Sequence, residues 1–182
     1  KLVEANDAFK DVFGHELPDI ASQGAVASEI RKACVTPEED LSATHKLLLT
    51  HQLPGASIIQ EAVDLLKSVR SGSEEQAILA FNAGHKLLKE SRKRSADLTE
   101  TLTEPALLAL GNARAALRDE WPILQAEVDL DPAFATQADE LRDLLARETF
   151  YKELAAISQH AAALKAVYRR RRTAAAEQWA AA

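Results

Sequence analysis

Two groups of basic side chains are the residues in this sequence best suited to bind a charged ligand. One is a set of lysines spaced three and four residues apart, and the other is a run of four arginines near the C-terminal end: Lys86, Lys89, Lys93, and Arg169, Arg170, Arg171, Arg172. Because such side chains pair with phosphates, both groups are candidate nucleic-acid contacts. The alternative is a solvated helix face, which the net charge of −6 and the lack of interleaved aromatic residues favour.

The five histidines do not have the spacing of a metal site. A di-iron centre in a helical bundle needs Glu-x-x-His, so that both ligands project from one helix face. The residues three positions before the histidines are not acidic: Val12, Ser42, Leu48, Asn82 and Ile157. No two histidines are four residues apart, which is the spacing of zinc ligands on one helix. We therefore expect no metal site.

The sequence also lacks the motifs of nucleotide binding and of nucleophilic catalysis. A P-loop needs Gly-x-x-x-x-Gly-Lys followed by Ser or Thr, and no glycine in this chain precedes a lysine. Cys34, the single cysteine, could act as a nucleophile with a distant histidine, but a small buried hydrophobic residue is the expected role. We expect no catalytic residue and no cofactor.

The spacing of apolar residues predicts a chain built only of helices. Hydrophobic residues make up 47% of the sequence, which contains only 6 glycines and 6 prolines. One amphipathic stripe is especially regular: Ile59, Ala62, Val63, Leu66 and Val69. The predicted fold class is all-α, either a helical bundle or two small helical lobes, with about seven helices and a long helix at the C-terminus.

Local signals predict where these helices begin and end. Thr36-Pro37-Glu38-Glu39 combines a capping threonine, a proline suited to the first helical position and a capping-box glutamate. It predicts a break between a helix over 21–34 and one that runs to about residue 52. Gly14, a residue suited to the left-handed position after a helix, predicts the end of a first helix. Ser73-Glu74-Glu75-Gln76 predicts a second capping box. Further breaks, kinks or connections are predicted at Leu102-Thr103-Glu104-Pro105, at Pro122 and over 129–136.

The residues from about 150 onward are predicted to form one long helix. Its apolar residues recur at spacings of three and four: Phe150, Leu154, Ile157, Ala161, Leu164, Val167 and Tyr168. We expect residues 1–148 to form a multi-helix bundle and residues 149–182 to form a helix that packs on it and is truncated. This last segment holds six basic and two acidic side chains, so it is the only basic end of the chain.

Composition also predicts a compartment. No stretch approaches the roughly 20 uninterrupted apolar residues that span a bilayer, and the first residues have no signal-peptide pattern. A single cysteine cannot form an internal disulfide. We expect a soluble cytoplasmic protein without a membrane partner. Because no methionine occurs anywhere, we also expect the segment to come from a longer chain.

Several short motifs together resemble a known family. They are Phe13-Gly14 with Leu17-Pro18, Leu53-Pro54-Gly55, Phe81-Asn82-x-x-His85, Leu102-Thr103-Glu104-Pro105, and Glu148-Thr149-Phe150-Tyr151 with Ile157-x-x-His160. In this order they resemble the helical region after the ATPase domain in large bacterial P-loop proteins of phage-defence systems, of the bacteriophage-exclusion and phage-growth-limitation type. The resemblance implies an ATP-hydrolysing parent protein that acts on or around phage DNA. Since the Walker motifs are absent here, no catalytic residue carries over.

Taken with the resemblance, the sequence predicts a non-catalytic module that couples an ATPase core to its partners or mediates assembly. Its partners would be the rest of the parent chain and other proteins. The alternative is a helical nucleic-acid-binding domain that contacts DNA through the two basic groups.

Overall fold

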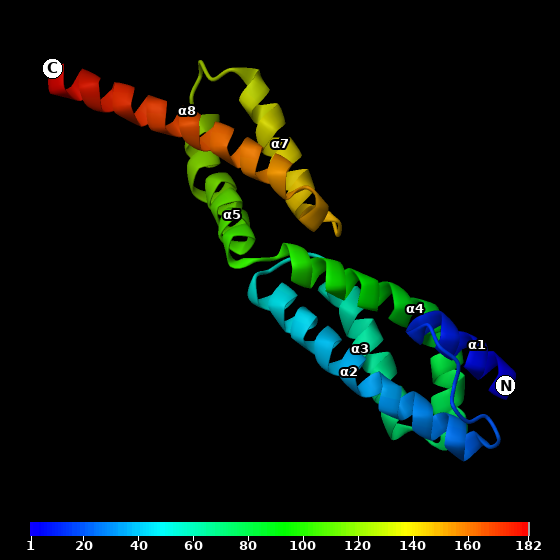
Figure 1. Cartoon of the computed structure of the whole chain (residues 1–182). Helices are drawn as coiled ribbons and strands as arrows, with labels where there is room; N and C mark the ends of the chain where they lie inside the picture. The colour runs from blue at the N-terminus through cyan, green and yellow to red at the C-terminus, as the bar shows by residue number, and fades with distance from the viewer. Residues whose placement is uncertain (182) are drawn as a thin grey trace. The chain divides into compact units, whose positions relative to one another are not determined.

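The computed structural model describes residues 1–181, and every regular element in that range is helical, which confirms the all-α prediction. The chain forms two compact units, Lys1–Glu100 and Thr101–Ala182. Helices of the first unit are α1 (Leu2–Phe13), α2 (Gln23–Thr50), α3 (Ala56–Ser71) and α4 (Glu74–Thr101) (Figure 1). The second unit contains α5 (Glu104–Ala115), a π-helical turn (Ala116–Glu120), α6 (Trp121–Gln125), α7 (Pro132–Ala146), a 3-10 helix (Phe150–Lys152) and α8 (Leu154–Ala181).

In the first unit, α2, α3 and α4 alternate in direction. Arg31 near the start of α2 donates hydrogen bonds to the carbonyls of Val69 and Gly72 at the end of α3, so these two helices are antiparallel. Thr44 near the end of α2 contacts Ser95 near the end of α4 through a buried hydroxyl pair at 2.5 Å, so α2 and α4 are parallel. The bends between them are short, as expected for neighbouring helices of a bundle.

Helix α2 runs without interruption through Pro37, so the predicted break at Thr36–Glu39 is wrong. A proline inside a helix lacks the N–H of one helical hydrogen bond, which costs about 3 kcal/mol. Burial offsets this cost, because Pro37 belongs to a row of buried residues at spacings of three and four: Ala27, Ile30, Cys34, Pro37, Leu41, Thr44 and Leu48. A helix end at this position would divide the row.

The acidic residues after Pro37 consequently have a role other than the predicted one. They lie in the middle of α2 and so do not supply negative charge to a helix N-terminus. Glu38 instead forms an ion pair of 3.1 Å with Arg70 near the end of α3. This pair adds to the contacts that hold α2 and α3 antiparallel.

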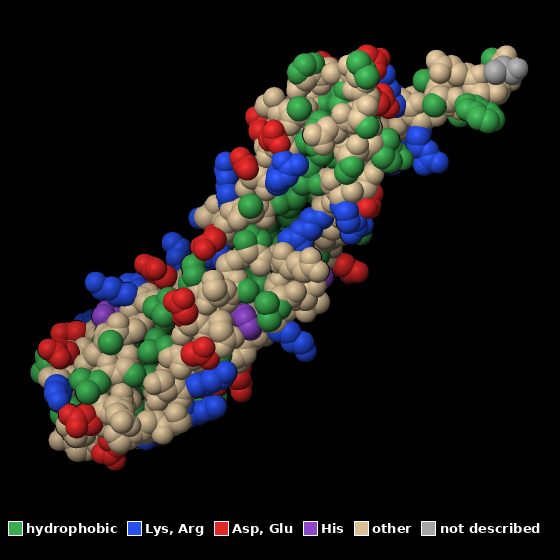
Figure 2. Space-filling model, turned by 180° about the vertical axis from the view of Figure 1, so that it is seen from behind, with side chains coloured by type: hydrophobic (Ala, Val, Ile, Leu, Met, Phe, Trp, Pro, Cys, Tyr) green, Lys and Arg blue, Asp and Glu red, His purple; other side chains and the backbone are tan. Residues whose placement is uncertain are grey.

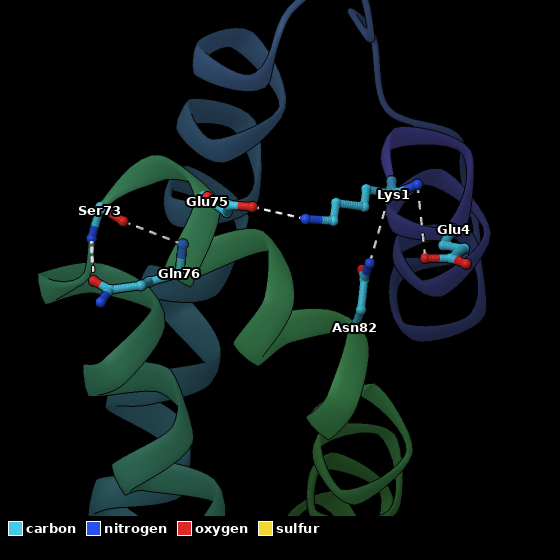
Figure 3. Close-up of polar contacts among 6 residues, drawn as sticks. All are labelled: Lys1, Glu4, Ser73, Glu75, Gln76 and Asn82. Carbon is cyan, nitrogen blue, oxygen red and sulfur yellow. Dashed lines mark hydrogen bonds and ion pairs between the residues drawn. The ribbon is translucent and has the colours of Figure 1, made fainter.

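The capping box predicted at Ser73–Gln76 is present at the start of α4 (Figure 3). The Ser73 hydroxyl accepts from the Gln76 backbone N–H at 3.3 Å, and the Gln76 side chain accepts from the Ser73 N–H at 2.9 Å. Beside it, the Lys1 ammonium donates to the Glu75 carboxylate at 2.7 Å. The reciprocal pair satisfies two of the N–H groups that a helix start leaves without partners.

Helix α1 lies along α4 and in the same direction. Lys1, just before α1, reaches Glu75, whereas at the last turn of α1 the Arg92 guanidinium of α4 donates to the Val12 carbonyl at 2.7 Å. Arg92 also lies 5.0 Å from the ring centroid of Phe13. Gly14 then ends α1 in the left-handed conformation (φ 79°), as the sequence predicted. A cation at this position complements the negative end of the helix dipole.

The second unit is organised around the first half of α8, which packs on α5, α7 and the π-helical turn. The buried residues of α8 are Ile157, Ala161, Leu164 and Val167. The predicted division after residue 148 therefore differs from the observed one at Glu100–Thr101. The physical reason is that α5 and α7 share their core with α8, whereas the break at Leu102–Thr103 separates two cores.

The hydrogen-bond pattern of the helix changes just before Pro122. The segment before it, Ala116–Glu120, is π-helical, and the Trp121 N–H bonds to the Ala116 carbonyl five residues back. Proline clashes with the carbonyl four residues before it, and a π-turn moves that carbonyl out of register. Trp121 and Leu124 are buried after this turn.

The connection predicted over 129–136 lies earlier in the structure, over 126–131, because α6 ends at Gln125 and α7 begins at Pro132. The Asp131 carboxylate accepts from the Ala133 N–H at 2.9 Å and caps the helix. Proline at the first helical position is favourable, since its missing N–H has no helical partner there. Within residues 1–181, no helix combines the length and the apolar character that crossing a bilayer requires.

A substitution of Pro37 tests the continuity of α2. Pro37→Ala restores one helical hydrogen bond and removes the steric clash of the ring, which stabilises the folded state by about 3 kcal/mol. It also removes two buried methylene groups of the ring, which destabilises the folded state by about 1.6 kcal/mol. We expect the free energy of unfolding to rise by about 1 kcal/mol, measured by urea denaturation.

Pro132→Ala is the matched control, because this proline stands at a helix start and its loss should be neutral or slightly destabilising. A continuous α2 would be contradicted if Pro37→Ala were less stable than the wild type, which is the result allowed for Pro132→Ala.

Candidate interaction surfaces

The predicted lysine row lies on the exposed side of α4, but one of its members is already paired. Lys86, Lys89 and Lys93 are all exposed. The Lys89 ammonium donates to the Asp11 carboxylate of α1, and this hydrogen bond lowers the pKa of Asp11. The row is thus interrupted by an acidic side chain from a neighbouring helix, which weakens it as a phosphate-binding surface.

The four consecutive arginines point in different directions, because successive residues on a helix are rotated by about 100°. Arg171 is the one that faces its own unit: its guanidinium forms ion pairs with Glu127 at 3.3 Å and with Asp129 at 3.1 Å. The hydrogen bond with Asp129 raises the pKa of Arg171, and the same bond lowers the pKa of Asp129. Arg171 thus joins α8 to the segment between α6 and α7.

The other three arginines, Arg169, Arg170 and Arg172, are exposed on α8. They belong to the second unit, whereas the lysine row belongs to the first. The two predicted basic groups therefore belong to different units. In both units acidic side chains outnumber basic ones.

A shallow groove of about 320 Å³ lies between α7 and α8. It is lined by Glu140, Asp143, Leu144, Arg147, Ala156 and His160. His160 Nε2 lies 3.5 Å from Glu140 Oε2, which is longer than a well-formed hydrogen bond, and Glu140 is exposed. The pair forms a contact between α7 and α8.

The remaining candidates for chemistry are in structural positions. Cys34 is buried in α2, and burial raises its thiol pKa to about 12, so the reactive thiolate is not populated at neutral pH. The His85 ring contacts the Asn82 carbonyl at 2.7 Å, as a residue at the edge of the core. Within residues 1–181, no group of three or more His, Cys, Asp or Glu side chains is arranged to hold a metal ion.

One exposed residue was not recognised from the sequence. Trp179 on α8 is 87% exposed, whereas Trp121, the other tryptophan, is buried. The signal was available, because Trp179 continues a spacing of three and four that begins in the buried part of α8: Ala161, Leu164, Tyr168, Arg171, Ala175, Trp179.

No family model, curated protein or solved structure matches this chain. What the molecule does is therefore argued from the surfaces of its described residues and from the resemblance of its motifs.

Arg171 and Arg172 make a matched pair for testing which arginine is structural. Arg171→Gln should lower the Tm of the second unit by a few degrees at most, because the lost ion pairs are solvent-accessible. Arg172→Gln should leave the Tm unchanged. Thermal unfolding followed by circular dichroism measures both.

The same comparison has a pH dependence whose sign follows from Asp129. The pKa of Asp129 is lowered in the folded state, so the ionised carboxylate stabilises the fold at neutral pH. This stabilisation is lost as the pH falls below the ordinary aspartate pKa of about 3.9. The difference between wild type and Arg171→Gln should vanish in that range. A difference that persists in strong acid would show that Arg171 acts through packing instead.

Proposed function

We propose that this chain is a non-catalytic helical module that couples or assembles the parts of a larger, ATP-binding phage-resistance protein. The observation that carries the proposal is the second half of α8. After Arg171 the helix continues to Ala181 with every residue exposed. Figure 1 shows this end of the helix, in red, extending past α5 and α7.

The first half of α8 gives that extension a firm base. Ile157 and Leu164 are fully buried, and Phe150 just before the helix is buried as well. A helix of 28 residues is about 42 Å long. Because one half is packed and the other is exposed, a displacement of the unit would be transmitted along the helix axis to whatever binds its outer half.

The motif resemblance supports the identity proposed for the parent protein. The helix-end signatures at Phe13-Gly14 and Leu102–Pro105 coincide with helix ends in the structure. In the family that they resemble, such motifs belong to a helical region that follows an ATPase domain, so nucleotide binding would belong to another part of the parent. The module itself would supply contact and rigidity.

Two measurements test this function. The purified chain should hydrolyse no ATP, and robust hydrolysis would contradict a non-catalytic role. In the full-length parent, replacing residues 172–181 by a Gly/Ser linker of equal length should abolish phage protection, measured by efficiency of plating, while nucleotide binding is retained.

A matched control replaces an exposed apolar residue elsewhere in the unit. Leu108 on α5 is 67% exposed, and Leu108→Ser should leave protection intact. Full protection without residues 172–181 would contradict the coupling role.

Nucleic-acid binding is the second candidate, favoured by the exposure of Arg169, Arg170 and Arg172. If these three side chains contact phosphates, binding should weaken by about 40-fold between about 50 and 200 mM salt, because each contact releases a counterion. A gel-shift titration with the triple Gln variant measures this. Absence of a shifted band at low salt would remove this candidate.

A further inference from the structure

The buried face of α8 continues beyond the part that the unit covers. Ala161 and Leu164 are buried, and Arg171 is held by Glu127 and Asp129. Ala175 and Trp179 lie on the same side of the helix, four and eight residues after Arg171. Both are exposed. The face that packs inside the unit is therefore extended by a small residue and a large aromatic one.

A row of basic residues runs beside this face. Lys165, Arg169 and Arg172 follow one another at spacings of four and three, and Trp179 is seven residues after Arg172. Within residues 1–181, no acidic side chain forms an ion pair with Arg169 or Arg172. In Figure 2 this part of α8, at the upper right, carries hydrophobic and basic side chains on its surface.

The chain itself shows what covers an arginine on this helix. Where the unit closes over α8, it places two carboxylates, Glu127 and Asp129, on Arg171. A partner that covers the outer half in the same way would provide carboxylates for Arg169 and Arg172. It would also provide an apolar recess for Trp179, since tryptophan is the side chain that most often anchors an interface.

We propose that the outer half of α8 is the docking surface of this module and that its partner is an acidic protein surface with an apolar pocket. Trp179 inserts into the pocket, and Arg169 and Arg172 pair with carboxylates at its edge. The inference rests on the proposed coupling function and names the chemistry of the partner. A second copy of this chain and a nucleic acid are the competing occupants.

The size of the surface sets the expected affinity. Residues 172–181 span about 15 Å of helix. Such a segment buries less than the roughly 1,200 Å² of a standard stable interface. We therefore expect a dissociation constant on the order of 10 µM for a single contact, as in transient complexes.

The test uses a synthetic amphipathic helical peptide of about 20 residues, with Leu and Ala on one face and Glu on its flanks. A twin peptide carries Gln in place of Glu. Fluorescence anisotropy of the labelled peptide measures binding, and tryptophan emission reports burial. The acidic peptide should bind saturably and shift the emission to the blue, whereas the Gln twin should bind much more weakly.

Variants assign the binding to the proposed residues. Trp179→Ala should weaken binding by about 30-fold, while Leu108→Ala, also at an exposed apolar residue of this unit, should not. The double variant R169E/R172E should abolish binding, and R118E/R142E, with the same charge change elsewhere in the unit, should not. Because Trp179, Arg169 and Arg172 are exposed, these variants should retain the circular dichroism of the wild type.

Each competing outcome would overturn the proposal. No saturable binding of the acidic peptide contradicts it. Binding of a single-stranded thymidine oligonucleotide that R169E/R172E removes, with no peptide binding, indicates a nucleic acid. A dimer in sedimentation that Trp179→Ala dissolves indicates a second copy. If the acidic peptide does not bind but replacing residues 172–181 in the parent abolishes protection, only the acidic partner is rejected. If protection survives this replacement, the coupling function is rejected.

Discussion

The first unit depends on one geometric constraint, which is that the buried row of α2 must remain continuous through Pro37. Ala27, Cys34, Leu41 and Leu48 are seven residues apart, and Ile30, Pro37 and Thr44 fill the same face between them. Two shorter helices meeting at Pro37 would turn one half of this row away from α3 and α4. The energy of burying the row exceeds the cost of one missing hydrogen bond, so the helix tolerates its proline. The parallel course of α2 and α4, and the buried Thr44–Ser95 pair, follow from this continuity.

Arginines that bind backbone carbonyls of a neighbouring element are a second recurring device. Arg31 binds the last carbonyls of α3, Arg92 binds a carbonyl at the end of α1, and Arg171 binds the segment that follows α6. Arg31 and Arg92 satisfy acceptors that a helix end leaves without partners, and all three side chains join two elements. The exposed arginines on α8, Arg169, Arg170 and Arg172, differ from these three, because their side chains are open to solvent.

Predictions from the sequence were correct where the signal lies within a few residues. They were wrong where packing against another helix determines the structure. The Ser73–Gln76 box and Gly14 were predicted correctly, because the chemistry of a helix end lies within a few residues. The same logic was misleading at Thr36–Glu39, where burial against another helix outweighs a good capping sequence. The role of Arg171 was equally inaccessible, since its partners at 127 and 129 are more than 40 residues away. Trp179 could have been found, because helical spacing alone places it on the face of Leu164.

The π-helical turn has an evolutionary consequence. Ala116 and Trp121 are both buried and are five residues apart, whereas residues on one face of a regular α-helix are three or four apart. The π-helical turn therefore contains one residue more than an α-helix would need to bury both side chains. A deletion there would keep both faces inward, but it would return Pro122 to a register in which its ring strikes a carbonyl. Segment length and the residue at 122 are therefore interdependent. Related chains that lack one residue in this turn should also lack the proline at position 122. An alignment would then show that a deletion in the turn and a residue other than proline occur together.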